Sequence, residues 1–204
     1  MSTGRDRGPE AAPLAVVQLL GAQAVGRLTR YVEMADRWSR AVGLVGGGSP
    51  ATRLWALIED SLAALPHLPQ EGRLLDVGSG VGIPAVPLLL ARPGLQGVLL
   101  EPRERRWAFL REVVRELDLP AEVRRERLSP GVGTGFVAMT VRGVERSHWE
   151  GLAGRVLATD GVVVWWTGER IAAEPPGGGE VRVLLCPMPA AGRGALVVWS
   201  PRST

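Results

Sequence analysis

Apolar residues recur at helical spacing in the first part of the chain. From Leu14 to Val45 they return every three or four positions, which predicts helices, and Gly21 and Gly26 are expected to divide this stretch into two. Ser49-Pro50 then predicts the start of another helix, because serine is a good N-cap and proline fits the first helical position. Pro66 is expected to end it.

Farther along, short apolar runs alternate with stretches in which apolar residues recur at helical spacing. The runs predict strands over 73–78, 97–101, 121–125, 135–141, 160–167, 181–186 and 194–200. Between them, the spacing predicts helices over 84–92, 103–117, 146–156 and 168–174. This alternation is typical of a doubly wound α/β sheet, and the last two strands, joined by a loop alone, should form an antiparallel hairpin. We expect a disordered tail over 1–12, a helical extension over 13–68 and a Rossmann-like domain with a seven-stranded sheet over 69–204.

One glycine-rich turn carries the clearest chemistry. The strand that contains Asp76 runs into Gly78, Gly80 and Gly82, and the next strand ends on Glu101, about 25 residues after Asp76. A carboxylate at that position can accept hydrogen bonds from both ribose hydroxyls of a nucleotide-like cofactor. Glycines in such a turn also let a ligand lie against bare backbone.

The spacing of this turn narrows the choice of cofactor. Dinucleotide sites use G-x-G-x-x-G and helix N–H groups that face a pyrophosphate. Here the pattern is G-x-G-x-G with an acid two residues earlier, and Pro84 removes one N–H that a phosphate would use. The pattern indicates S-adenosylmethionine, and a nicotinamide-dependent oxidoreductase is the remote alternative.

Composition excludes several classes of protein. Of 204 residues, 46% are hydrophobic and 22% are charged, which is typical of a globular protein with a core of its own. The single cysteine, Cys186, excludes an internal disulfide, and no Cys/His spacing supports a metal site. No apolar run approaches the roughly 20 residues of a membrane helix, and the polar N-terminus lacks the apolar core of a secretory signal. We therefore expect a cytoplasmic protein with no membrane contact.

The charge of the chain is compatible with RNA without requiring it. The net charge is +3, and every basic residue is arginine. Four arginines share one face of the predicted N-terminal helices, namely Arg27, Arg30, Arg37 and Arg40. This face is either a track for an RNA backbone or an ordinary solvated surface.

Three stretches resemble the glucose-inhibited division protein B family. They are Asp76-Val-Gly-Ser-Gly-Val-Gly-Ile-Pro-Ala-Val-Pro87, Leu99-Leu100-Glu101 and Trp107-Ala-Phe-Leu-Arg-Glu-Val113. Weaker similarity extends over Trp38-Ser39-Arg40, Asp60-Ser61-Leu62, Arg127, Thr140-Val141-Arg142 and Arg193. The resemblance implies a class I S-adenosylmethionine-dependent methyltransferase fold. It also implies N7-methylation of a guanine in small-subunit (16S) ribosomal RNA, with the RNA or the ribosomal particle as partner of a monomeric enzyme.

The resemblance also implies a set of site residues. The cofactor-binding residues it gives are Asp76, Gly78, Ser79, Gly80, Gly82, Ile83, Glu101, Pro102, Arg127, Leu128 and Arg142. Arg142 and Arg127 are the catalytic candidates, because Arg142 ends a strand at the edge where open α/β sheets bind ligands, and its guanidinium can contact guanine or phosphate.

Some positions depart from the family's pattern. A lysine before glycine is replaced by Thr167, a histidine before Asp60-Ser61-Leu62 by Leu57, an asparagine by Gly43 and an acid by Ser129. These changes leave open a diverged relative that binds S-adenosylmethionine but methylates another acceptor or none.

The reaction requires few catalytic groups. Guanine N7 carries a free lone pair, so its methylation needs positioning and desolvation more than a general base. The chain accordingly shows no His/Asp constellation: His67 is predicted in a turn and His148 on an exposed helix, neither of them catalytic. Cys186 is predicted to be a core residue and not a nucleophile.

Overall fold

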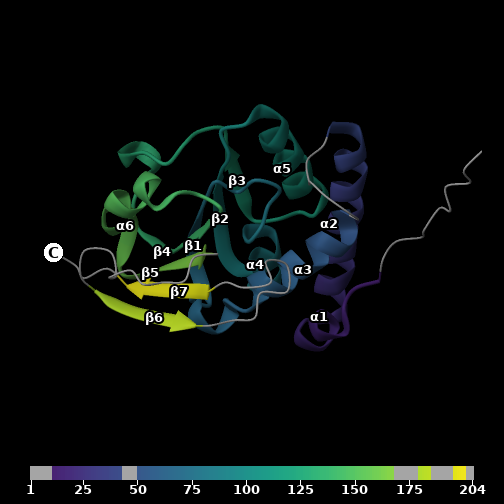
Figure 1. The fold of residues 1–204 in the computed structure, drawn as a ribbon, viewed down its shortest axis with the longest axis horizontal. Coiled ribbons are helices and arrows are strands. Elements are labelled where there is room, and N and C mark those ends of the chain that lie inside the picture. The colour runs from purple at the N-terminus through teal and green to yellow at the C-terminus, as the bar shows by residue number, and fades with distance from the viewer. Residues whose placement is uncertain (1–10, 43–49, 168–178, 185–194, 201–204) are drawn as a thin grey trace, which may run out of the picture.

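The computed structural model describes residues 11–42, 50–167, 179–184 and 195–200, and Figure 1 shows their arrangement. The helices are α1 (Leu14–Leu19), α2 (Ala22–Val42), α3 (Pro50–Leu62), η1 (Leu65–His67), α4 (Ala85–Ala91), α5 (Glu104–Glu116), η2 (Pro130–Val132), η3 (Arg146–His148) and α6 (Glu150–Val156). The strands are β1 (Glu71–Val77), β2 (Gly94–Leu100), β3 (Ala121–Arg124), β4 (Phe136–Arg142), β5 (Leu157–Thr167), β6 (Glu180–Leu184) and β7 (Ala195–Ser200).

One seven-stranded sheet forms the centre of the molecule. Its order is β3-β2-β1-β4-β5-β7-β6. The strands from β3 to β5 run parallel, whereas β7 is antiparallel to both β5 and β6. The chain order reverses between β1 and β4, and a ligand in such a sheet binds beyond the carboxyl ends of the strands at that reversal. The predicted sheet and its terminal antiparallel pair are confirmed.

Successive residues of the strands pack alternately into two apolar clusters. Leu74 of β1 faces a cluster that includes residues of α2, α3, α4 and α5, whereas Leu75 faces the cluster around α6. In Figure 1 the N-terminal helices accordingly lie at one end and α6 near the other. Because α2 and α3 share the core of the sheet, the predicted boundary at residue 68 marks a change of pattern and not a separate core.

The N-terminal helices differ from prediction at one glycine. Gly21 separates α1 from α2 as expected, but α2 continues through Gly26 to Val42. A single glycine costs a helix about 1 kcal/mol, and here burial of Leu28 and Tyr31, both fully inaccessible, offsets it. Helix α3 begins at Pro50 and ends at Leu62, a few residues earlier than Pro66. Ser49 and the predicted helix over 168–174 lie outside the described residues.

The helix predicted over 146–156 is interrupted. Trp149, with φ −139° and ψ −27°, separates η3 from α6. Its ring is 1% exposed and packs against Trp165 of β5, with ring centroids 5.5 Å apart. Burial of this large side chain therefore outweighs continuous helical hydrogen bonding at this position.

Candidate functional site

A cavity of about 490 Å³ lies where β1, β2, β3 and β4 end. Its lining consists of Val77, Gly78, Leu100, Glu101, Pro102, Arg103, Arg106, Glu126, Arg127, Leu128, Gly143, Val144, Glu145 and His148. All of these residues belong to, or follow, the carboxyl ends of the four strands beside the reversal of strand order. The volume is within the usual range for a small-molecule site.

Glu101 joins two walls of this cavity. The residue directly follows β2 and is 3% exposed. Its Oε2 accepts the Gly80 N–H at 2.9 Å, and its Oε1 accepts the Arg103 N–H at 2.7 Å. The carboxylate therefore holds the glycine turn and the start of α5 in place, and its remaining lone pairs stay available to a ligand.

The glycine turn requires bare backbone at two positions. Gly78 has φ +71°, and a Cβ there would lie 2.5 Å from Cγ2 of Val144. Gly82 has φ +99°, and a Cβ there would lie 2.6 Å from Cγ2 of Val86. Any larger residue would push the turn away from α4 or from the segment after β4.

Asp76 is a buried carboxylate just before the glycine turn. It is 1% exposed, its Oδ1 accepts the Thr140 hydroxyl at 2.6 Å, and its Oδ2 has no hydrogen-bond partner. Burial raises the pKa of Asp76 to about 6, with the nearby hydroxyls of Ser79 and Thr140 opposing the rise and the charge of Glu101 adding to it. The site thus holds a buried acceptor that a cationic or N–H group of a ligand would satisfy.

Arg142 connects the end of β4 to the N-terminal helices. Its Nη2 donates to Oδ2 of Asp60 in α3 at 2.9 Å, and the side chains are 15% and 0% exposed. Trp166 of β5 donates its indole N–H to the Asp60 carbonyl at 3.0 Å. Arg142 does not line the cavity, although Gly143 next to it does.

Comparisons with known proteins identify the family. A family model described as rRNA small subunit methyltransferase G (GidB) matches residues 25–175. The chain belongs to the GidB family. Relatives named ribosomal RNA small subunit methyltransferase G include one from Mycobacterium avium, 32% identical over 88% of this chain and 82% of that protein. Another, from Erwinia tasmaniensis, is 35% identical over 74% of this chain and 77% of that protein.

Solved structures agree on the fold. A putative methyltransferase, yhhF from Escherichia coli, matches with a TM-score of 0.57 and 17% identity, covering 72% of this chain and 87% of that one. The tRNA (m1A58) methyltransferase TrmI from Aquifex aeolicus gives 0.54 and 18%, covering 69% and 67%. Family and fold together confirm the predicted class, an S-adenosylmethionine-dependent methyltransferase. Membership in the GidB family excludes the nicotinamide oxidoreductase alternative.

The residues expected from the GidB pattern fall into two groups in the structure. Five of them line the cavity: Gly78, Glu101, Pro102, Arg127 and Leu128. The others support its walls without lining it: Asp76, Ser79, Gly80, Gly82, Ile83 and Arg142. Their individual roles toward a ligand stay predictions.

Several lining residues were not predicted as site residues. They are Arg103 and Arg106 near the start of α5, Glu126 after β3, and Val144, Glu145 and His148 after β4. His148, expected on an exposed helix, is exposed at the end of the short 3-10 helix η3, and it also lines the cavity. A sequence signal existed, because each of these residues follows within a few positions of a predicted strand end. Their directions, however, depend on the break at Trp149 and on the start of α5.

Tyr31 of α2 was also not predicted from the sequence as a residue of the site. Its hydroxyl donates to the Val81 carbonyl of the glycine turn at 2.6 Å. Burial and the nearby charge of Asp76 raise the pKa of Tyr31, so the hydroxyl stays protonated and remains a donor. The N-terminal helices of this GidB-family chain thus contact the turn that forms one wall of the cavity.

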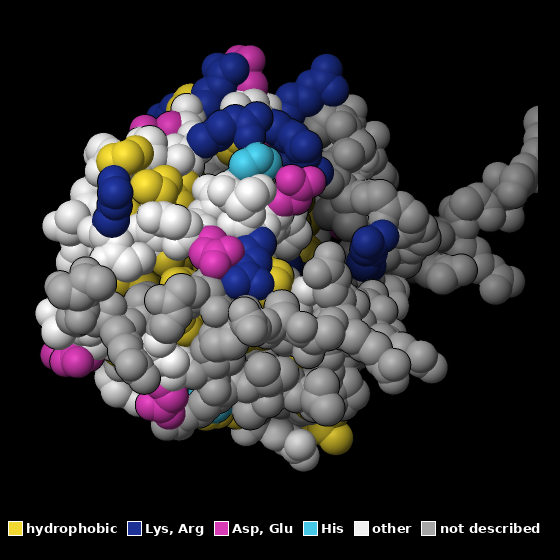
Figure 2. Space-filling view, turned by 60° about the vertical axis from the view of Figure 1, so that its left-hand side comes forward, with side chains coloured by type: hydrophobic (Ala, Val, Ile, Leu, Met, Phe, Trp, Pro, Cys, Tyr) yellow, Lys and Arg dark blue, Asp and Glu magenta, His cyan; other side chains and the backbone are white. Residues whose placement is uncertain are grey.

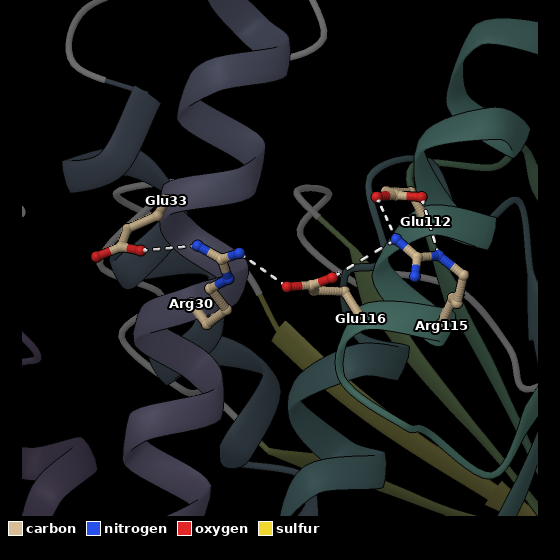
Figure 3. A network of polar contacts seen from close by, with 5 residues as sticks. All are labelled: Arg30, Glu33, Glu112, Arg115 and Glu116. Atoms are coloured by element: carbon tan, nitrogen blue, oxygen red, sulfur yellow. Dashed lines mark hydrogen bonds and ion pairs between the residues drawn. The ribbon is translucent and has the colours of Figure 1, made fainter.

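The arginine face of α2 is used mainly for packing. Arg27 donates to the carbonyls of Leu117 and Asp118, just after α5. Arg30 pairs with Glu116 at 2.7 Å, in a network that also includes Glu33, Glu112 and Arg115 (Figure 3). Arg37 is exposed, and the side chain of Arg40 lies outside the described part, as does Arg193. Two of the four arginines therefore fasten α2 to α5.

In the described ranges, no group of three or more His, Cys, Asp or Glu side chains is placed to hold a metal ion. No helix in the same part of the chain is long and apolar enough to cross a membrane. Cys186 lies outside the described residues.

Proposed function

We propose that this chain transfers a methyl group from S-adenosylmethionine to N7 of a guanine in small-subunit (16S) ribosomal RNA. The observation that supports it most is the cavity at the reversal of strand order, where Glu101 stands beside the glycine turn in a chain of the GidB family. The relatives are named for methylation of small-subunit ribosomal RNA, and the proposal extends that activity to this chain.

The polar groups around the cavity fit the cofactor. The unpartnered Oδ2 of buried Asp76 suits the cofactor's ammonium group, directly or through water. The carboxylate of Glu101 suits the two ribose hydroxyls, and the side chains of Pro102 and Leu128 offer apolar contact to adenine. When bound, S-adenosylmethionine supplies a methyl group on a positively charged sulfur.

The chain's own task is then to position the acceptor. Guanine N7 has a free lone pair, so a residue that removes a proton is not required. Arg142 is the proposed contact to the guanine or its phosphate: its Nη1 is buried with no hydrogen-bond partner, and the residue ends β4 next to the cavity. Arg127, exposed after β3 in the lining of the cavity, is the second proposed contact.

A diverged relative with another acceptor remains the second candidate. Thr167, which replaces the family's lysine, is buried at the end of β5 and is 6% exposed, so it offers neither charge nor reach. The two candidates differ only in the acceptor. We further propose that the enzyme acts as a monomer in the cytoplasm, where ribosomal particles are assembled.

Calorimetry tests the cofactor half of this proposal. We expect S-adenosylmethionine to bind with micromolar affinity, roughly −8 kcal/mol, and NAD not to bind. Glu101→Ala should weaken binding by about 1.5–3 kcal/mol for each charged hydrogen bond to ribose that is lost. The matched control is Glu71→Ala, an exposed glutamate at the opposite end of β1. Equal affinity of wild type and Glu101→Ala would contradict the ribose role.

A methyl-transfer assay tests the acceptor half. Arg142→Lys keeps a positive charge beside Asp60 but loses the planar fork of the guanidinium. We expect transfer to small-subunit particles to fall by at least about tenfold while cofactor affinity is unchanged, which is roughly 1.4 kcal/mol of transition-state stabilisation. Transfer by Arg142→Lys at the wild-type rate would contradict the role of Arg142, whereas no transfer to these particles by the wild-type chain would favour the diverged relative.

A further inference from the structure

Three arginines at the cavity have no acidic partner. Arg103 and Arg127 are exposed and Arg106 is partly exposed, and all three line the cavity. Within the described part of the chain, no carboxylate and no hydrogen-bond acceptor pairs with any of their guanidinium groups. Figure 2 shows basic side chains gathered beside a histidine on one face of the molecule.

The charges nearby do not neutralise this group. Glu101 accepts hydrogen bonds from two backbone N–H groups and forms no ion pair with these arginines, and Glu126 lies 3.7 Å from the guanidinium of Arg124. Glu145 follows β4 and lines the same cavity, and within the described part of the chain no ion pair joins it to any of the three arginines. The side of the cavity formed by α5 and the end of β3 therefore carries an excess of positive charge.

The arginines of α2 offer a clear contrast. Arg27 is held by two carbonyl groups and Arg30 by two glutamates. An RNA phosphate that approached α2 would have to compete with these partners, whereas the arginines of the cavity have none to give up. The available positive charge is thus concentrated at the cavity and not along the N-terminal helices.

We propose that Arg103, Arg106 and Arg127 form the surface that binds the sugar-phosphate backbone of the RNA at the cavity mouth. Guanidinium groups bind phosphate oxygens in a planar, two-point geometry, and such contacts fix the register of a nucleic acid without reading its sequence. The inference rests on the proposed function and adds the path by which the RNA reaches the cofactor. It assigns two residues, Arg103 and Arg106, that carried no role in the sequence.

Arg106, which lines the cavity, also lies close to the glycine turn. Its Nη1 lies 4.0 Å from the position that a Cβ on Gly80 would take. The guanidinium is therefore close enough to the cofactor side for a rival role, contact with the cofactor's own carboxylate. Separate measurements of RNA and cofactor affinity distinguish the two roles.

Salt-dependent RNA binding is the test. The probe is a transcript of small-subunit ribosomal RNA, titrated over a range of KCl concentrations with the wild-type chain and with Arg103→Gln, Arg106→Gln, Arg127→Gln and the triple variant. We expect each single change to weaken binding about three- to tenfold near 0.1 M salt, and the triple change to reduce the slope of log K against log salt by about two. A triple Arg→Lys variant should keep most of the affinity, because lysine still binds phosphate as a point charge.

Two control variants separate this surface from others. Arg37→Gln removes an exposed arginine on α2, and Arg155→Gln removes an exposed one on α6. Both should bind RNA within about twofold of wild type, and Arg103→Gln, Arg106→Gln and the two control variants should bind S-adenosylmethionine within the same margin. A wild-type salt slope in the triple Gln variant, or a larger loss in Arg37→Gln, would overturn the proposal. So would a loss of cofactor affinity in Arg103→Gln or Arg106→Gln that parallels the loss of RNA affinity.

The result of the RNA-binding test does not depend on whether the chain transfers a methyl group. If the wild-type chain binds RNA through these arginines but makes no methylguanosine, the binding surface stands and the proposed reaction fails. If it methylates the RNA and the triple Gln variant does so with an unchanged KM for RNA, the reaction stands and this surface is wrong.

Discussion

Asp76 illustrates how a single buried carboxylate lowers the stability of the folded chain. Its carboxylate is surrounded by protein, with Thr140 bonded to one oxygen and nothing to the other. Burial raises the pKa of Asp76 to about 6. Since an unfolded aspartate titrates near 3.9, the folded chain binds more protons than the unfolded chain between these pH values.

The pH dependence of stability follows from this difference. Stability contributed by protonated Asp76 is lost as the pH rises from about 4 to about 6, and the loss at pH 7 is on the order of 3 kcal/mol. Asp76→Asn should therefore become more stable relative to wild type as pH rises through this window, and constant above it, while cofactor affinity falls. Urea denaturation of both proteins at pH 5 and pH 7 checks the sign. A stability difference independent of pH would contradict the raised pKa.

At the scale of elements, the N-terminal helices reach the site at two points. Tyr31 of α2 contacts the glycine turn through Val81, and Asp60 of α3 pairs with Arg142 at the end of β4. Helical spacing predicted these helices, but it could not predict where they dock. Contacts between residues 31 and 81, or 60 and 142, arise only when the sheet has assembled.

Tyr31→Phe tests the contact with the glycine turn. The ring keeps its packing against Phe109, but the Val81 carbonyl loses its donor, which costs about 1–3 kcal/mol. We expect lower stability together with a several-fold loss of cofactor affinity. Thr29→Val is the matched control, because that hydroxyl donates to the Val25 carbonyl within the same helix and does not reach the turn. Unchanged cofactor affinity in Tyr31→Phe would show that the contact only supports the fold.

The buried ion pair allows a second test at this scale. Asp60→Ala leaves the guanidinium of Arg142 without its partner at 85% burial, and it should destabilise the chain by about 3–5 kcal/mol. The double variant Asp60→Leu/Arg142→Met should recover most of that loss, since an apolar pair carries no desolvation cost. Chemical denaturation of wild type, Asp60→Leu, Arg142→Met and the double variant measures the coupling, and additive losses in the double variant would contradict it.

At the scale of the whole molecule, the alternation of strands and helices was enough to predict the sheet and its terminal antiparallel pair. Glu101 was predicted for the same reason, because the end of its strand is visible in the sequence, whereas Pro102, Arg127 and Leu128 were implied by the resemblance to the GidB family. Residues such as Arg103 and His148 depend instead on how a helix starts or a turn breaks. Those details are decided by packing, as at Trp149, and no local pattern reports them.

The central claim, methylation of small-subunit ribosomal RNA, is tested most directly by a map of methylated guanines. The map compares a strain that lacks this chain with the same strain carrying the wild-type chain or Glu101→Ala. We predict that one N7-methylguanosine of small-subunit ribosomal RNA disappears in the deletion strain and returns with wild type but not with Glu101→Ala. If every N7-methylguanosine remains in the deletion strain, the proposed function is wrong.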